Sequence, residues 1–189
     1  MMSRRLASAG AALALALGVS ACGNKHSVVT EAETEGIYLD VGEVTYQVQI
    51  SRQLNPGAIP EDRTFVTGVD AGESKLGSGE GWFAVFVRAE NESHDPQPAA
   101  TTFEIKDADG HSFEPVELGP ENPFRYSGGT LKDRGVLPSP NSVAGQTSIN
   151  GLELLFKIDI DVLDSSRPLK LEIHSPTDDD VVAEVDLDV

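Results

Sequence analysis

Apolar residues recur at every second position along much of this chain. The clearest run follows Asn150-Gly151, and its alternating apolar residues are Leu152, Leu154, Phe156, Ile158 and Ile160. A β-strand directs successive side chains to opposite faces, so this pattern indicates strands that bury one face. No segment after residue 21 carries the 3.6-residue apolar stripe of an amphipathic helix. The alternation therefore restricts the chain to an all-β fold.

The same pattern predicts further strands at residues 44–50, 103–106, 169–173 and 181–189, and residues 82–90, which are apolar on both faces, suit a central strand. The turn residues Asp107-Ala108-Asp109-Gly110 join 103–106 to a return through 111–116, which makes a β-hairpin. A short strand at 65–69 and a single helical turn at 159–166 are also compatible with the sequence. Together these elements predict an antiparallel Ig-like β-sandwich of about seven strands with long connecting loops.

Two of the connections, residues 52–79 and 117–148, are unusually long and rich in glycine and proline. Loops longer than about 12–15 residues in a compact domain tend to be functional or mobile, so we expect a binding surface there. The second loop contains Phe124, Arg125 and Tyr126, and aromatic and arginine side chains are enriched in interface hot spots. These three residues are a candidate partner contact, and the alternative is that they pack the loop onto the sandwich.

The N-terminus has the layout of an export signal. Two arginines, Arg4 and Arg5, precede an uncharged run from Leu6 to Val19, which is too short to span a bilayer. The next residues, Val19-Ser20-Ala21-Cys22, resemble the lipobox of bacterial lipoproteins. The resemblance implies cleavage before Cys22, a diacylglyceryl group on its thiol and usually acylation of the new amine. Cys22 is the only cysteine, so it has no internal disulfide partner.

The chain therefore divides into a signal peptide (1–21), a lipidated cysteine with a flexible tether (22–36) and one domain (37–189). The lipid would hold the domain outside the cytoplasm, on the cytoplasmic membrane or on the outer membrane of a diderm cell, after general secretory or twin-arginine export. Removal of two arginines with the signal peptide changes the net charge from −17 to −19. A field of this sign argues against nucleic acid as a partner and favours cations or a basic partner.

Several stretches follow one another in a recognisable order: the tether, the 46–50 strand, Pro60-Glu61-Asp62-Arg63, the 81–91 strand and the hairpin over 103–116. In this order the chain is similar, over residues 40–175, to the small telokin-like, Ig-like domains of bacterial lipoproteins. The resemblance implies the β-sandwich fold and no activity, because such sandwiches host many unrelated functions.

Candidate metal and catalytic residues are sparse. Asp107-x-Asp109-Gly110 resembles part of a calcium loop, but an EF-hand would place its end ligands at Ile105 and Val116, so a hairpin turn is favoured. The run Asp178-Asp179-Asp180 is a weak candidate for a cation site, with a solvated acidic loop as the alternative. The four histidines show no paired spacing, and the mature chain contains neither Gly-x-Ser-x-Gly nor Ser-x-x-Lys.

These observations favour a non-catalytic, membrane-anchored module that binds a protein or another envelope component, with no cofactor. The acidic composition leaves a second interpretation open, a small-ligand or cation-binding accessory protein of a transport system. An enzyme is a third interpretation, because some all-β sandwiches are hydrolases. The sequence indicates neither the partner nor the oligomeric state.

Overall fold

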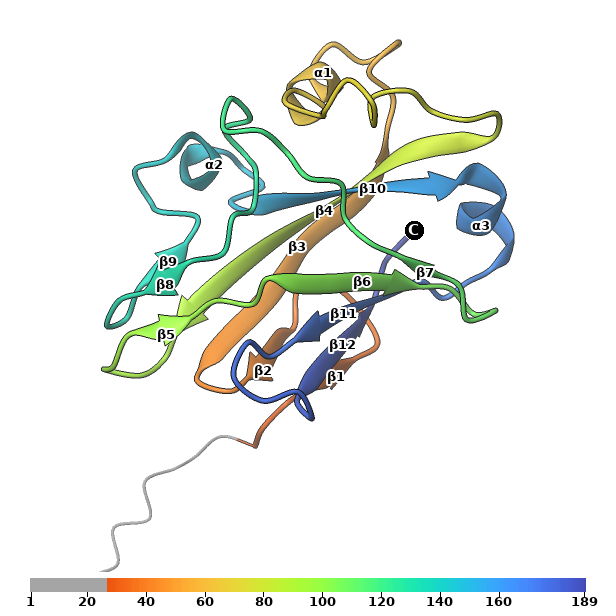
Figure 1. Cartoon of the computed structure of the whole chain (residues 1–189). Coiled ribbons are helices and arrows are strands. Elements are labelled where there is room, and N and C mark those ends of the chain that lie inside the picture. The colour runs from red at the N-terminus through yellow and green to blue at the C-terminus, as the bar shows by residue number, and fades with distance from the viewer. Residues whose placement is uncertain (1–26) are drawn as a thin grey trace, which may run out of the picture.

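The computed structural model describes residues 27–189 as an antiparallel β-sandwich with three short helices (Figure 1). Sheet A has the strand order β1 (Glu31–Ala32), β12 (Val182–Asp186), β11 (Lys170–His174), β6 (Thr102–Lys106) and β7 (Ser112–Phe113). Sheet B has the order β10 (Leu152–Asp159), β4 (Glu80–Asn91), β3 (Val44–Leu54) and β2 (Tyr38–Val41), and β9 (Val136–Leu137) also pairs with β4. A separate pair joins β5 (Gln97–Pro98) to β8 (Thr130–Leu131).

The predicted all-β sandwich is confirmed. Seven of the strands in the described chain are four residues or longer, and six of these seven coincide with predicted strands. The seventh, β2, gave no alternating signal because Leu39, Asp40 and Val41 are all buried. The helical turn expected at 159–166 is α3 (Ile160–Ser165).

The short strand considered at 65–69 is wrong. The chain there forms α1 (Asp62–Phe65), and Val69 makes only an isolated bridge with Leu118. The cause is Asp62, whose buried carboxylate accepts a hydrogen bond from the Asn55 backbone N–H (2.7 Å) and pairs with the Arg52 guanidinium. These contacts fold the loop back onto β3, so the segment cannot extend.

The main core lies between the two sheets and follows the alternation of the strands. Its largest fully buried members include Tyr46, Phe83, Phe156, Ile105 and Leu171. Each large apolar side chain buried in this way contributes about 1.5–3 kcal/mol to stability. The one polar atom in these five side chains is the Tyr46 hydroxyl oxygen, which accepts a hydrogen bond from the Ala100 backbone N–H (2.6 Å).

The two long loops pack over the outer face of sheet B and close a second apolar cluster. Phe65 from the first loop and Phe124 from the second meet edge to face, with ring centroids 4.9 Å apart, and Phe65 also packs on Phe86 of β4. Trp82, the only tryptophan, is buried in this cluster at 5% exposure, not between the sheets. The loops are therefore part of the packed structure. The third short helix, α2 (Val143–Gln146), buries Ala144 in the same cluster.

The N-terminal segment differs from the expected tether. Strand β1 pairs in parallel with β12, and just before it Val29 exchanges hydrogen bonds with Asp40 of β2. The segment carried no recognisable period because its strand is only two residues long. The signal peptide, Cys22 and the start of the predicted tether (22–26) lie outside the described residues. Within residues 27–189, none of the helices has the length and apolar character needed to cross a bilayer.

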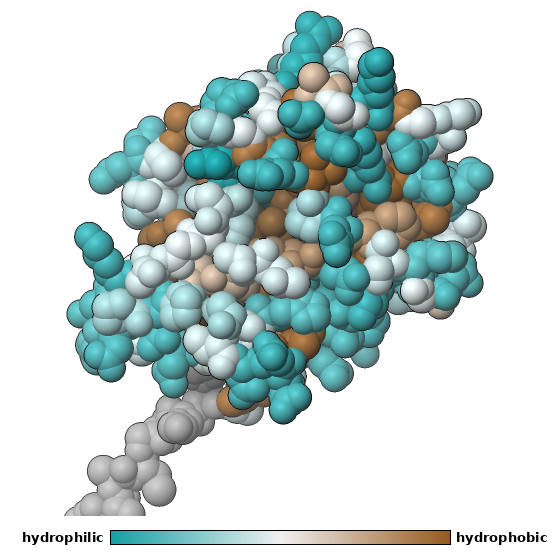
Figure 2. Space-filling model, in the orientation of Figure 1, coloured by the Kyte–Doolittle hydropathy of each residue, from teal (hydrophilic) through white to brown (hydrophobic). Residues whose placement is uncertain are grey.

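Figure 1 shows how these parts are arranged: the described chain begins at the end of the sandwich near β1 and β2, and α1 lies at the opposite end. In Figure 2 hydrophilic side chains cover most of the visible face, and apolar residues show through across its middle.

Candidate functional site

The outer face of sheet A carries a row of four glutamates on four neighbouring strands. The register places Glu104 of β6 opposite Glu172 of β11, Glu172 opposite Glu184 of β12, and Glu184 opposite Glu31 of β1. The alternate residues of these strands face the core, so all four carboxylates lie on the solvent side. Like charges directly opposite one another in a sheet are destabilising, so this row favours any cation that approaches it.

Two lysines in the next row neutralise part of this charge. Lys106 Nζ lies 2.7 Å from Glu172 Oε1 and 3.5 Å from Glu104 Oε2, and Lys170 Nζ lies 3.1 Å from Glu184 Oε2. The hydrogen bond to Glu172 raises the pKa of Lys106, and the hydrogen bond to Glu184 raises the pKa of Lys170. Asp186 also stands in this row, opposite Lys170. Five carboxylates and two lysines leave this face, here called the open face of sheet A, with a charge of −3.

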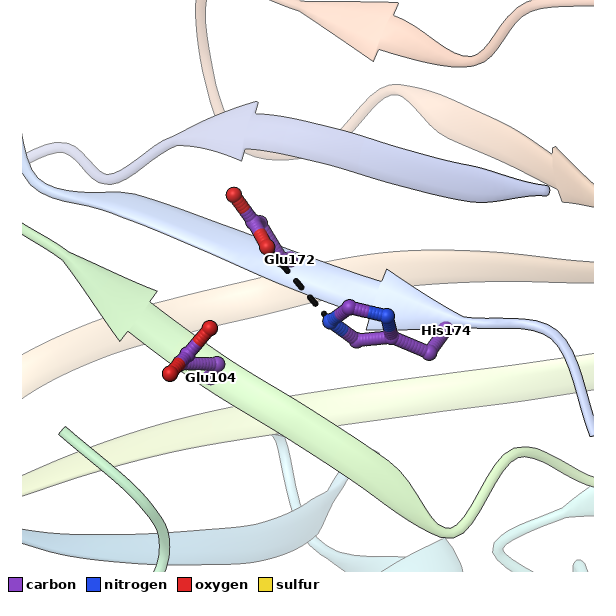
Figure 3. A group of neighbouring side chains, drawn as sticks. All are labelled: Glu104, Glu172 and His174. Carbon is purple, nitrogen blue, oxygen red and sulfur yellow. Dashed lines mark ion pairs between the residues drawn. The ribbon is translucent and has the colours of Figure 1, made fainter. Parts of the chain in front are cut away.

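His174 stands beside the row, opposite Thr102 and Val182 and on the side away from the two lysines. It lies two residues after Glu172 on β11 and therefore on the same side of the sheet, as Figure 3 shows. Its Nε2 is 3.4 Å from Glu172 Oε2, and ligand atoms of Glu104, Glu172 and His174 all lie within 4.8 Å of one another. Glu172 is nearly buried, at 10% side-chain exposure, whereas His174 keeps 33%. The three side chains make a compact group of one imidazole and two carboxylates.

A hollow of about 440 Å³ lies beside this group, and Glu104, Glu114 and His174 form part of its wall. A second hollow, of about 300 Å³, lies where the second long loop passes the edge of β10. Its lining includes Arg125, Tyr126, Glu153 and Leu154. Glu153 is 1% exposed, and burial raises its pKa to about 8, so it holds a proton at neutral pH.

Sequence reasoning missed Glu104, Glu172 and His174 as a group. It found no paired spacing among the histidines and placed Glu104 only within the predicted strand at 103–106. Two signals were available: Glu172 and His174 stand two residues apart in a strand, as do Glu104 and Lys106, so each pair shares a face. What joins the two pairs is the β6–β11 register, which no local pattern contains.

The hairpin at Asp107–Gly110 is confirmed as a turn between β6 and β7. The Asp107 carboxylate accepts hydrogen bonds from the backbone N–H groups of Asp109 (2.9 Å) and His111 (2.8 Å), and it contacts His111 Nδ1 at 2.8 Å. Burial acts to raise the pKa of Asp107, but its hydrogen bonds with His111 outweigh burial and hold that pKa below its usual range. Gly110 adopts a φ of 88°, as the turn requires. The Asp107 carboxylate is therefore already engaged by its own turn.

The acidic run Asp178–Asp180 lies in the exposed turn between β11 and β12. The Asp178 carboxylate accepts a hydrogen bond from the Asp180 N–H (3.1 Å), and its carbonyl accepts one from Val181 (3.0 Å). Two groups of three metal-ligating side chains occur among residues 27–189, and neither includes this run. Cation binding at Asp178–Asp180 stays a prediction.

The candidate partner contact, Phe124–Tyr126, runs beside β10 and bonds to both backbone groups of Glu153. Phe124 is buried in the second apolar cluster, and the Tyr126 hydroxyl donates to the Ala100 carbonyl (2.9 Å). Arg125 is half-buried and lines the smaller hollow. Tyr126 is also half-buried and lines the same hollow, so a partner could reach Arg125 and Tyr126 on the folded domain more readily than Phe124, and a partner contact here stays a prediction.

Comparison with known proteins finds solved structures of low sequence identity. No protein-family model matches it, and no curated protein does. The yjhA protein from Bacillus subtilis is 15% identical at a TM-score of 0.48, and the match covers 82% of this chain and 99% of that one. The ycdA protein of the same organism, provisionally described as a lipoprotein, is 13% identical at 0.47, with 82% of this chain and 39% of that one covered.

An uncharacterised β-sandwich protein from Clostridium difficile is 9% identical at a TM-score of 0.45, covering 87% of this chain and 98% of that one. Likenesses at this level assign no function. The strand pairing of the chain itself establishes that residues 27–189 form a β-sandwich.

Proposed function

We propose that this chain is a lipid-anchored, extracytoplasmic and non-catalytic β-sandwich that binds a basic partner of the cell envelope through the open face of sheet A. The glutamate row is the observation that carries the proposal. Glu104, Glu172, Glu184 and Glu31 stand opposite one another across four strands, although such pairing costs stability. A cationic partner relieves this repulsion, so binding such a partner is energetically favourable.

The two faces of the molecule support the choice of sheet A. The outer face of sheet B is covered by the long loops and their apolar cluster. On the outer face of sheet A, Lys106, Lys170 and His174 keep between 33% and 44% of their side-chain area exposed. Complementary charge increases the rate of encounter and the specificity of an interface, so this acidic face suits a basic protein surface.

Charge reversal on matched positions tests the binding face. The probe is a decalysine peptide, titrated into the full chain at low and at physiological salt. Glu104→Lys with Glu184→Lys should weaken binding at least about tenfold at low salt, because two row positions become repulsive. Glu43→Lys with Glu61→Lys, two exposed glutamates outside sheet A, changes the net charge equally and serves as the control. An equal loss of affinity in both pairs would show that net charge alone, and not the open face, attracts the probe.

The anchor is tested separately. Mass spectrometry of the native protein should find an N-terminus at Cys22 that carries a diacylglyceryl group, and Cys22→Ser should release the protein from the membrane fraction. Two or three acyl chains on one residue hold a protein firmly, whereas one chain binds only marginally. A chain that still begins at Met1, or a free thiol at Cys22, would contradict the anchor.

A further inference from the structure

We infer that Glu104, Glu172 and His174 form a binding site for a divalent transition-metal ion of the Zn²⁺ type. The inference goes beyond the proposed docking role and does not depend on it, because the geometry of the three side chains is set by the fold of this chain and not by a partner. It rests on the distances within the group, on the chemistry of its donors and on the hollow beside it.

The distances fit a tetrahedral ion. Zinc binds histidine nitrogen and carboxylate oxygen at about 2.0–2.2 Å, so two ligand atoms of a tetrahedral site lie roughly 3.4 Å apart. His174 Nε2 and Glu172 Oε2 are already 3.4 Å apart. One carboxylate oxygen of Glu104 lies within 4.8 Å of a ligand atom of each of the other two residues, so it must approach by at most about 1.4 Å, which is within the reach of a glutamate side-chain rotation.

The backbone holds the three residues in place. Glu104 and Glu172 are direct cross-strand partners on β6 and β11, and His174 follows on the same face of β11. Both strands lie inside sheet A, each hydrogen-bonded to a neighbour on either side. The ligands therefore stand on rigid elements, as a preorganised site requires.

The donor set selects the class of ion. Imidazole nitrogen suits zinc, copper, nickel and iron, whereas calcium and magnesium prefer oxygen ligands alone. Three protein ligands leave one tetrahedral position open, as in zinc sites that also bind water or a further ligand. That position has room here, since Glu104 and His174 both line the hollow of about 440 Å³, with Glu114 on the same wall.

Lys106 occupies the place of the cation when no metal is bound. Its Nζ contacts both Glu172 oxygens, at 2.7 and 2.8 Å, and approaches Glu104 at 3.5 Å. An incoming ion must compete with this ammonium group for the same carboxylates. Removal of Lys106 should therefore tighten metal binding, an effect that damage to the fold would not produce.

The test is a titration of the full chain in detergent with Zn²⁺ alone, and with Co²⁺, whose visible absorption reports a tetrahedral environment. We expect one site whose affinity falls at least about tenfold in Glu104→Gln and in His174→Gln. Lys106→Met should raise the affinity. Asp109→Asn and His111→Gln alter the other carboxylate–histidine group in the same chemical way and should leave it unchanged. Cys22→Ser removes any contribution of a free thiol.

The outcomes separate clearly. An absence of binding in the unaltered chain, an affinity that survives His174→Gln, or loss of the site in His111→Gln would each overturn the inference. If Glu104→Gln or His174→Gln lowers the melting temperature, the gain in Lys106→Met and the Co²⁺ spectrum decide the question. Metal binding without decalysine binding would support this inference and not the docking role. Decalysine binding without metal binding would support the docking role and not this inference.

Discussion

The two apolar clusters on either side of sheet B share its strands but are closed in different ways. The inner cluster is closed by a second sheet, whose backbone groups are paired within the ladders. The outer cluster is closed by two loops, whose backbone groups need other partners. Asn122 supplies them: its amide donates to the carbonyls of Phe65 (2.9 Å) and Thr67 (3.1 Å) in the other loop. A face covered by strands can stay apolar, whereas a face covered by loops takes polar groups into its core.

The largest expected effect is on the inner cluster. Phe156→Ala should lower the free energy of unfolding by about 3–5 kcal/mol, because Phe156 is fully buried between rigid sheets that cannot collapse into the cavity. Phe124→Ala in the outer cluster should cost about 1–3 kcal/mol less, because a loop relaxes more readily than a sheet. Urea denaturation of both variants measures the difference. Equal losses would show that the loops pack as rigidly as the sheets.

The next effect is the pH dependence of stability that comes from Glu153, the buried carboxyl group beneath the loops. Burial raises the pKa of Glu153 to about 8 from its ordinary value of 4.5. The native state then keeps a proton that the unfolded state loses, so this residue lowers native stability as the pH rises from 4.5 to about 8, by up to about 1.4 kcal/mol per pH unit. Glu153→Gln should remove this decline and be more stable than the unaltered chain at pH 8 by up to about 4 kcal/mol. Glu43→Gln, at an exposed position, is the control, and parallel pH profiles for the unaltered chain and Glu153→Gln would refute the assignment.

The hydrogen bonds that Asn122 makes between the two loops should have a smaller, local effect on stability. Asn122→Ala leaves the Phe65 and Thr67 carbonyls and the Glu153 carboxyl group without this donor, which should cost about 1–3 kcal/mol. Hydrogen exchange should quicken in α1 and the residues after it more than in β11, because the inner cluster is untouched. Asn141→Ala, at an exposed position, should change neither. Uniform acceleration across both sheets would mean that the two clusters unfold as one unit.

The smallest effect lies at the margin of the outer cluster. Lys157 Nζ sits 5.6 Å from the centroid of the Trp82 ring and 2.8 Å from Glu73 Oε2 in the first long loop. Lys157→Gln should lower stability by about 0.5–1 kcal/mol, because an ion pair with an exposed partner such as Glu73 and a single cation–π contact are each weak. Lys75→Gln is the matched control at an exposed position. A loss above about 2 kcal/mol would show that this corner is far more important to the cluster than its exposure suggests.

The same contrast explains what could be predicted from the sequence. The inner cluster follows from alternation, since Leu154, Phe156 and Ile158 point inward as expected. The outer cluster does not follow from alternation, because it depends on contacts such as the one between Asn122 and Phe65, 57 residues apart, and no repeating sequence pattern marks these contacts. The β-sandwich was therefore predictable, whereas the packing of the long loops was not.

The candidate site depends on register in the same way. Glu104, Glu172 and His174 were predictable as polar positions on strands, but Glu172 meets Lys106 across 66 residues of chain. A slip of one residue between β6 and β11 would turn one set of side chains into the core, so the burial of Phe103 and Ile105 fixes the site indirectly. Its residues can be named from the sequence only after the pairing is known.

The N-terminal segment ties the two sheets to each other. Val29 bonds to Asp40 on β2 of sheet B, and two residues later Glu31 and Ala32 pair with β12 of sheet A. The segment is therefore hydrogen-bonded to both sheets at one edge of the sandwich. A pull on the chain upstream of Ser27 would act on both sheets at that edge at once. Because Val29 and Ala32 also pack against the inner cluster, the pull would have to break these contacts before the two sheets could separate.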